Sequence, residues 1–375
     1  MGTMRAVSSQ NAGPSVRRSA SSSRAARRVG RAGALGARAS MATGKKSVLI
    51  VNTPGGGHAV LGYSLAKKLS AEGHAVSVVV PCEETSSKML KPPFTLFGDL
   101  TDMGVSCYWS ADGVGAPELA DAKFDVVLDN NGKDIESVGP SIEFARASSE
   151  QFVFISSAGM YKASPGGQAG KPYVEGDPVK ESAGHNKVEE MLRESEDSLK
   201  WSSFRPQYMT GYGQNKDCEE YFLDRLVRGR PVCVPGDGTQ ITSVTPVEDL
   251  TDMLAAAVGN PASYNKLFNC VGERTVTLDG MVELCAKTAG VEAKIVHYDP
   301  DAIGVEVKKA FPFRPVDFYA EPKAAKELLG WAPKVDLEKA LAERYEFYTT
   351  SGRAGKEMTF ELDDQIIEKV SENVN

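Results

Sequence analysis

The sequence has few of the residues that build metal centres or disulfide frameworks. Its 375 residues include six cysteines, none of them in a Cys-x-x-Cys pair, and four histidines that are not spaced as ligand pairs. Scattered cysteines favour free thiols in a reducing compartment. No apolar run approaches the ~18–20 residues that a membrane-spanning helix needs. The composition therefore argues against a disulfide-stapled scaffold, a His/Cys transition-metal site and a membrane span.

Acidic residues are missing from the N-terminal part of the chain, where the first one is Glu72. Residues 1–41 contain eight arginines and many Ser and Ala, a composition typical of an organellar transit peptide. The alternative is a basic tail that contacts nucleic acid. Without these eight arginines the net charge changes from −7 to −15, so the mature protein is expected to be acidic.

The rest of the chain alternates apolar strands with helices, which predicts an α/β fold with a doubly wound parallel sheet, Rossmann-like. Strands are expected at 47–51, 75–80, 124–130, 152–157 and 201–205, and helices at 61–73, 142–147 and 187–194. The pattern loosens after Gly211, with helices expected at 218–228 and 278–289 and a strand at 231–234. We predict a transit peptide over 1–41 and a Rossmann-like domain over 42–210. A smaller C-terminal α+β domain over 211–375 is expected to be partly interleaved with the sheet.

Six segments, spread over about residues 46–348, resemble the extended short-chain dehydrogenase/reductases in order and spacing. Besides the Gly-rich turn they are FVFISSAGMY, FRPQYMTGYG, DRLVRGRPVCVPGDGTQITSVTPVEDL, FNCVGERTVTLDGM and FYAEPKAAKELLGW. The resemblance implies a dinucleotide-type fold whose ligands bind at the carboxyl ends of the strands.

The cofactor motif of that family is altered here. Its G-x-x-G-x-x-G loop corresponds to Gly56, Ala59 and Gly62, so the middle glycine is an alanine. Such a loop can hold a phosphate, or can simply be a tight strand-to-helix turn without a ligand. The second strand ends at Val80-Pro81, where the family needs a carboxylate for the ribose hydroxyls. These changes count against NAD(P) binding.

The catalytic residues of the family are altered as well. Hydride transfer uses a serine and a Tyr-x-x-x-Lys pair, in which the lysine lowers the pKa of the tyrosine. Ser157 matches the serine, but Glu181 and His185 stand at the tyrosine and lysine positions. The pairs Tyr63/Lys67 and Tyr212/Lys216 have the Tyr-x-x-x-Lys spacing, but they lie on the opening helix and beyond the sixth strand. We therefore expect no dehydrogenase activity.

These departures are similar to those of one branch, the a-type chloroplast stem-loop-binding proteins. The shared segments include FDVVLDNNGKD, FISSAGMYK, AGH before VEEML, NKDCEEYFLDR and IVHYDPDAIGV. The resemblance implies a plastid (stromal) endoribonuclease that binds stem-loop mRNA and rRNA and cleaves with a divalent cation, Mg²⁺. It also implies association with ribosomes or transcription complexes, and homo-oligomers or hetero-oligomers with a related b-type protein.

A metal-dependent nuclease needs carboxylates that hold the ion and activate water. The segment DNNGKD at the end of a strand makes Asp129, Asn130 and Asp134 the predicted metal and catalytic residues, with Glu181 and His185 as neighbours. The alternative is a polar loop that bonds its own backbone. Likewise, Ser157, Glu181 and His185 can act in acid–base chemistry or form a structural cluster that replaces the missing tyrosine.

An acidic protein needs a local basic surface to bind RNA phosphates. The segment FLDRLVRGRP supplies Arg225, Arg228 and Arg230, or these are the solvated end of a helix. Lys308, Lys309 and Arg314 are possible additions. Tyr161 lies in a loop at the sheet's carboxyl edge and can stack on an unpaired base or pack into the fold. The same alternatives apply to Tyr173, Tyr208 and Tyr212.

Four functions follow from these observations. The first is an RNA-binding protein with metal-dependent endonuclease activity, and the second is a non-catalytic RNA or ribosome scaffold. The third is an NAD(P)-dependent epimerase or reductase, and the fourth is a dinucleotide sensor without chemistry. Cofactor titration separates the last two from the first two.

Overall fold

Parallel strands form the central element of the protein. The computed structural model describes residues 44–55, 58–163, 170–213 and 218–374. Seven strands pair in the order β10-β6-β5-β4-β1-β2-β3, every neighbour parallel. Their bounds are β1 Ser47–Asn52, β2 Ala75–Val80, β3 Ser106–Trp109, β4 Val126–Asn130, β5 Gln151–Ile155, β6 Lys200–Pro206 and β10 Lys266–Cys270. The predicted doubly wound sheet is confirmed.

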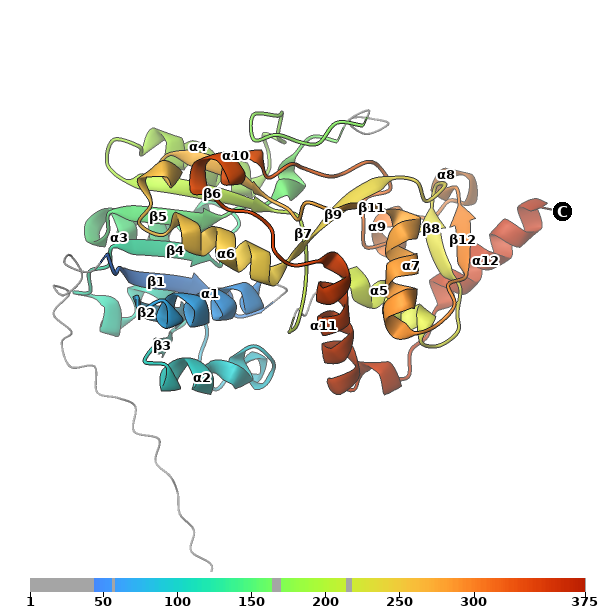
Figure 1. Ribbon diagram of the computed structural model, residues 1–375, viewed down its shortest axis with the longest axis horizontal. Helices are drawn as coiled ribbons and strands as arrows, with labels where there is room; N and C mark the ends of the chain where they lie inside the picture. The colour runs from blue at the N-terminus through green and yellow to red at the C-terminus, as the bar shows by residue number, and fades with distance from the viewer. Residues whose placement is uncertain (1–43, 56–57, 164–169, 214–217, 375) are drawn as a thin grey trace, which may run out of the picture. The chain divides into compact units, whose positions relative to one another are not determined.

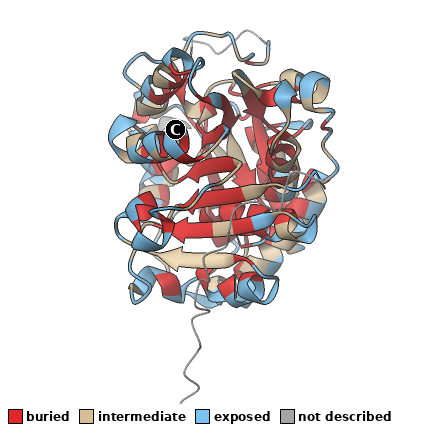
Figure 2. Cartoon of the chain, turned by 90° about the vertical axis from the view of Figure 1, so that its left-hand side faces the viewer, coloured by how far each residue is buried: buried red, intermediate tan, exposed pale blue. Residues whose placement is uncertain are grey.

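Helices cover both faces of this sheet (Figure 1). On one face Ile50 packs in a cluster with α1 (Ala59–Ala71) and α6 (Val247–Ala257). On the other face Leu49 packs in a cluster with α3 (Ile135–Ser148) and α4 (Gly184–Glu194). Because consecutive strand residues point to opposite faces and both faces are covered, strands such as β1, β2 and β5 are mostly apolar. Figure 2 shows the buried strands between exposed helix surfaces.

The chain from Tyr208 onward contributes to the large sheet and also builds two small ones. Strand β10 joins the edge of the seven-stranded sheet beside β6. The small sheets contain β7 (Tyr208–Thr210), β9 (Ile241–Pro246) and β11 (Thr275–Thr277), and β8 (Val232–Pro235) with β12 (Ile295–Tyr298). The remaining helices are α2 Phe97–Asp102, α5 Cys218–Leu226, α7 Leu278–Ala289, α8 Pro300–Ile303, α9 Val307–Ala310, α10 Lys323–Leu329, α11 Leu337–Thr350 and α12 Glu361–Val374.

Several of these elements have weak sequence signals. Strand β3 was not predicted, because its four residues SCYW are only partly buried at the edge of the sheet. Strand β10 was not predicted because KLFNC is short and lies in the part of the chain after Gly211, which was assigned to the smaller domain. Within the described ranges, no helix combines the length and the apolar composition needed to cross a membrane.

Candidate functional site

A pair of buried amides braces the turn that corresponds to the dinucleotide loop. Asn52, the last residue of β1, donates from Nδ2 to the carbonyl of Ala59 at 3.1 Å. Asn130, the last residue of β4, donates from Nδ2 to Asn52 Oδ1 at 2.8 Å and to the carbonyl of His58 at 2.7 Å. The structure therefore gives Asn130 a bracing role between two strand ends. Gly56 lies outside the described residues.

The third position of the loop is a glycine for a steric reason. A Cβ on Gly62 would lie 2.2 Å from Asn52 Oδ1, so helix α1 can approach β1 only with glycine there. Close helix–strand packing is also the role of the third glycine in the dinucleotide-binding fingerprint. Strand β2 ends at Val80, and Pro81 follows it. The strand end thus offers no side-chain carboxylate for a ribose.

Asp129 bonds the turn that follows its own strand. Its side chain is fully buried, and Oδ1 accepts hydrogen bonds from the backbone N–H of Asn131 at 2.8 Å and of Gly132 at 2.7 Å. Burial raises the pKa of the Asp129 carboxyl, and these backbone bonds oppose the shift. The geometry is that of the self-bonded polar loop, the alternative to the predicted metal site.

Asp134 caps the next helix. It is the N-cap of α3, and Oδ1 accepts from the backbone N–H of Ser137 at 3.0 Å and from its hydroxyl at 2.6 Å. These bonds lower the pKa of Asp134. The start of α4 packs against this loop, because a Cβ on Gly184 would lie 2.5 Å from the carbonyl of Lys133. His185 follows, and burial lowers its pKa.

The three residues expected near the former catalytic site have different partners. Ser157 Oγ accepts from the backbone N–H of Gly159 at 3.1 Å. The Glu181 side chain is 87% exposed and pairs with Lys162 at 3.3 Å, before α4 begins. In the described part of the chain, Ser157, Glu181 and His185 make no hydrogen bond to one another, so the expected cluster does not form.

No group of three or more His, Cys, Asp or Glu side chains among the described residues is arranged to hold a metal ion. Asp129 and Asp134 are each committed to a neighbouring backbone N–H. Their metal-binding and catalytic role stays a prediction.

A buried ion pair lies beneath the carboxyl edge of the sheet. Arg205 donates from Nε to Glu189 Oε1 at 3.0 Å and from Nη2 to Oε2 at 2.5 Å. Its Nη1 donates to the hydroxyl of Tyr161 and to the carbonyl of Glu175, both at 2.9 Å. The Tyr161 hydroxyl in turn donates to Asn269 Oδ1 at 2.7 Å. Tyr161 has no exposed surface and its ring stacks on that of Tyr173, with centroids 4.7 Å apart, which is the packing alternative; stacking on a base stays a prediction.

The arginines predicted to contact RNA are engaged within the protein. Arg225 forms a bidentate pair with Asp363, at 2.7 and 2.9 Å, and Arg230 pairs with Asp364, both on α12. Arg228 donates to the carbonyl of Asp224 at 2.9 Å and to further carbonyls. Arg225 and Arg230 anchor the C-terminal helix α12, and the RNA-binding role of the three arginines stays a prediction.

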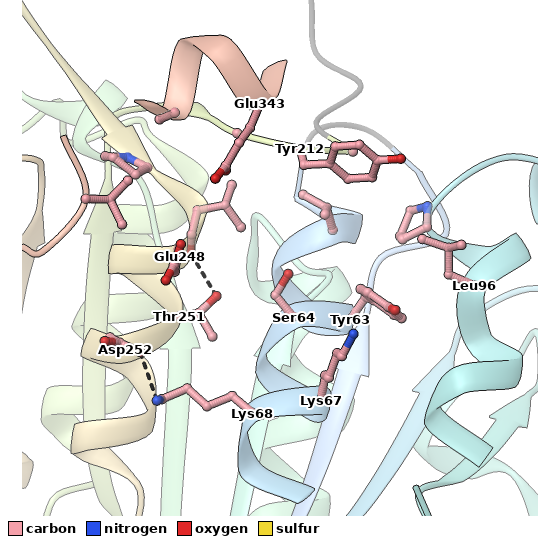
Figure 3. Close-up of a pocket in the computed structure, with 18 of the residues that line it drawn as sticks. Tyr63, Ser64, Lys67, Lys68, Leu96, Tyr212, Glu248, Thr251, Asp252 and Glu343 are labelled. Atoms are coloured by element: carbon pink, nitrogen blue, oxygen red, sulfur yellow. Dashed lines mark hydrogen bonds and ion pairs between the residues drawn. The ribbon is translucent and has the colours of Figure 1, made fainter. Parts of the chain in front are cut away.

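A cavity of about 620 Å³ opens between α1, α6 and α11 (Figure 3). Its charged lining consists of Lys67, Lys68, Glu248, Asp252 and Glu343, and Lys68 pairs with Asp252 at 2.9 Å. Three acids against two lysines do not favour a phosphate ligand. None of the residues predicted to be catalytic or metal-binding lines this cavity.

The sheet order and the glycine turn define the class of the protein, an extended short-chain dehydrogenase/reductase fold. The structure is similar to UDP-glucuronic acid 4-epimerase from Bacillus cereus, with a TM-score of 0.63 and 16% identity over 81% of this chain and 99% of that one. It is also similar to UDP-glucose 4-epimerase from Thermotoga maritima, with a TM-score of 0.61 and 19% identity over the same shares. At these identities the likeness concerns the fold alone.

A sequence relative is more informative. The chain is 36% identical to the chloroplast stem-loop binding protein of 41 kDa b of Arabidopsis thaliana over 348 residues, which are 88% of this chain and 86% of the relative. The chain therefore belongs to the family of chloroplast stem-loop-binding proteins. No family model matches it.

Sequence reasoning missed the residues that organise this edge of the sheet. Asn52 was not singled out, although an asparagine that ends an apolar strand is a signal of a buried polar contact. Glu189 and Arg205 lie in two separate motifs, and their spacing of 16 residues does not indicate a direct ion pair.

Proposed function

We propose that the protein binds stem-loop-containing RNA in the plastid and performs no hydride transfer. Membership of the chloroplast stem-loop-binding family carries this proposal, because the 36% identity extends over 88% of the chain. The printed name of the relative states both its chloroplast location and its stem-loop ligand. The arginine-rich leader, with no acid before Glu72, supports the same compartment.

The former active site supports the loss of hydride transfer. Glu181 stands at the position of the family's tyrosine, and His185 at that of its lysine. An exposed carboxylate paired with Lys162 cannot take the place of a phenol whose pKa is lowered by a lysine. The end of β2 at Val80 also lacks the carboxylate that would hold a ribose.

Finer parts of the proposal concern the branch and the partners. The a-type motifs of the sequence and an identity of only 36% to a b-type protein support an a-type assignment. Association with plastid ribosomes or transcription complexes, and oligomers that include the b-type protein, belong to the same proposal.

RNA binding and cleavage are tested together. A labelled stem-loop RNA is titrated with the full chain and with a chain that starts at residue 42, in magnesium and in chelator. Because the leader holds eight arginines, comparing the two chains separates its contribution from that of the folded part. NADPH is titrated in parallel, and an Asp129→Asn variant is included because it keeps the turn's acceptor.

Stem-loop binding by the shorter chain, with no NADPH binding, supports the proposal. Magnesium-dependent cleavage that is lost in Asp129→Asn would add the nuclease activity predicted from the sequence. Binding without cleavage would make the protein an RNA scaffold. No RNA binding together with micromolar NADPH binding would overturn the proposal in favour of a dinucleotide enzyme or sensor.

A further inference from the structure

Two cationic side chains converge on one carbonyl at the carboxyl edge of the sheet. Lys180 Nζ lies 3.3 Å and Arg314 Nη2 2.5 Å from the oxygen of Gly159, two residues after Ser157. This is the edge of an open α/β sheet where ligands bind. A third cation is the exposed Lys308 on α9, whose positive charge lowers the pKa of Lys180.

The scaffold fixes these cations in place. Lys180 follows a short bridge between Tyr161 and Val179, and its backbone N–H donates to the carbonyl of Met160 at 2.8 Å. The Arg314 guanidinium lies over the ring of Phe318, 3.8 Å from its centroid. Lys180 and Arg314 are therefore held in position by contacts within the protein.

The neighbouring acids pair with other lysines. Glu181 pairs with Lys162, and Glu306 pairs with Lys309. Within the described ranges, Lys180, Lys308 and Arg314 form no ion pair with a carboxylate. Burial lowers the pKa of Lys180 and the charges of Arg314 and Lys308 lower it further, as expected where like charges gather.

One donor of Arg314 has no acceptor within the described part of the protein. Arg314 Nη1 is buried and has no hydrogen-bond partner, which is costly for a charged donor. A phosphate supplies several charged oxygen acceptors at once, which suits the exposed Lys180 and Lys308. Elsewhere in the protein, Arg225 and Arg230 form ion pairs with carboxylates of α12.

We propose that Lys180 and Lys308 form the phosphate-contacting surface for RNA, with Arg314 holding the loop beside them. This inference rests on the proposed RNA-binding function. It moves the RNA site from the arginines near α5 to the carboxyl edge of the sheet.

The test compares two double variants of the full chain. Lys180→Gln/Lys308→Gln removes the exposed charges and leaves Arg314 in place. Lys200→Gln/Lys266→Gln removes two exposed lysines at the starts of β6 and β10, at the opposite edge of the sheet. Both variants have the same net charge and the same leader. Binding of a labelled stem-loop RNA is measured by anisotropy between 50 and 200 mM KCl in chelator, after circular dichroism has confirmed the fold.

Each phosphate contact contributes about 0.7–0.9 to the slope of log affinity against log salt, so losing two contacts reduces the slope by about 1.4–1.8. We expect this reduction and an affinity loss of about tenfold or more at 50 mM KCl in the first variant, and a change of about twofold or less in the second. Equal affinities and slopes of the two variants, while the unmodified chain binds RNA, would overturn the inference and leave the proposed function standing. An unmodified chain that does not bind RNA would overturn both.

Discussion

The buried pair between Glu189 and Arg205 gives the sharpest test of how this fold is held together. Glu189 on α4 and Arg205 on β6 have 0% and 1% exposed side chains, and two hydrogen bonds join them. Replacing Arg205 by Met keeps most of the apolar volume but leaves the buried Glu189 carboxylate without its buried counter-ion. It also removes the donor to the Tyr161 hydroxyl.

The expected loss is large because the remaining charge cannot reach water. Removing one partner of a buried ion pair typically costs about 3–5 kcal/mol. A double variant, Arg205→Met with Glu189→Met, removes both charges and should lose less than Arg205→Met alone. The sum of the two single losses should exceed the loss of the double variant by about 1–3 kcal/mol, as expected for residues in contact.

The chain offers a matched control on the same carboxylate. Arg193 also approaches Glu189, with Nη2 at 3.4 Å from Oε2, but its side chain is 44% exposed. Because water screens this pair, Arg193→Met should cost about 1 kcal/mol or less.

Urea denaturation followed by circular dichroism measures all four variants at pH 7. A loss below about 1 kcal/mol for Arg205→Met, equal to that of Arg193→Met, would refute the reasoning, because it would mean that the buried carboxylate finds another partner or water. Additive losses in the two single variants would refute the direct coupling.

Three further predictions concern single positions. Burial lowers the pKa of His185 in the folded state, so below about pH 6.5 the unfolded chain binds a proton that the folded chain does not. The free energy of unfolding therefore decreases as the pH decreases. His185→Phe should flatten this dependence in urea titrations from pH 7 to 5, and an unchanged slope would contradict it. Asp129→Asn keeps the acceptor for the turn without the buried charge and should change the free energy of unfolding by less than about 1 kcal/mol. Asp129→Ala leaves the N–H groups of Asn131 and Gly132 without an acceptor and should cost about 2 kcal/mol or more. Gly62→Ala should lower the free energy of unfolding by about 1–3 kcal/mol in thermal or urea unfolding, because its Cβ would meet Asn52. Gly98→Ala on α2, with open space around it, should be neutral or slightly stabilising. Similar losses at both glycines would contradict the steric argument.

The class of fold could be predicted from the sequence, because its signals are local. Apolar runs such as SVLIV and AVSVVV require a sheet covered on both faces, and the glycine turn after the first run requires a helix that follows at once. Strands β1, β2, β5 and β6 and helices α1, α4 and α7 appear within a few residues of their expected bounds. The family resemblance also came from motifs read along the chain, and the 36% identity to a family member confirms it.

The roles of polar residues could not be predicted in the same way. Asp129 and Asn130 are adjacent in a motif that suits a metal, yet one bonds its own turn and the other braces the loop after β1. The sequence left both possibilities open, because a carboxylate or an amide serves equally well as a ligand and as a cap.

The arginines make the same point at longer range. Arg225 and Arg230 resemble a basic patch in the sequence, but α12 brings Asp363 and Asp364 to them from more than 130 residues away. Arg314, by contrast, meets Lys180 at one carbonyl across a similar separation. The sequence alone determined most of the secondary structure, the class of fold and the family, since their signals lie among neighbours in the chain. Only the tertiary structure decided which charges are paired and which stay available, because that depends on contacts between residues far apart in the sequence.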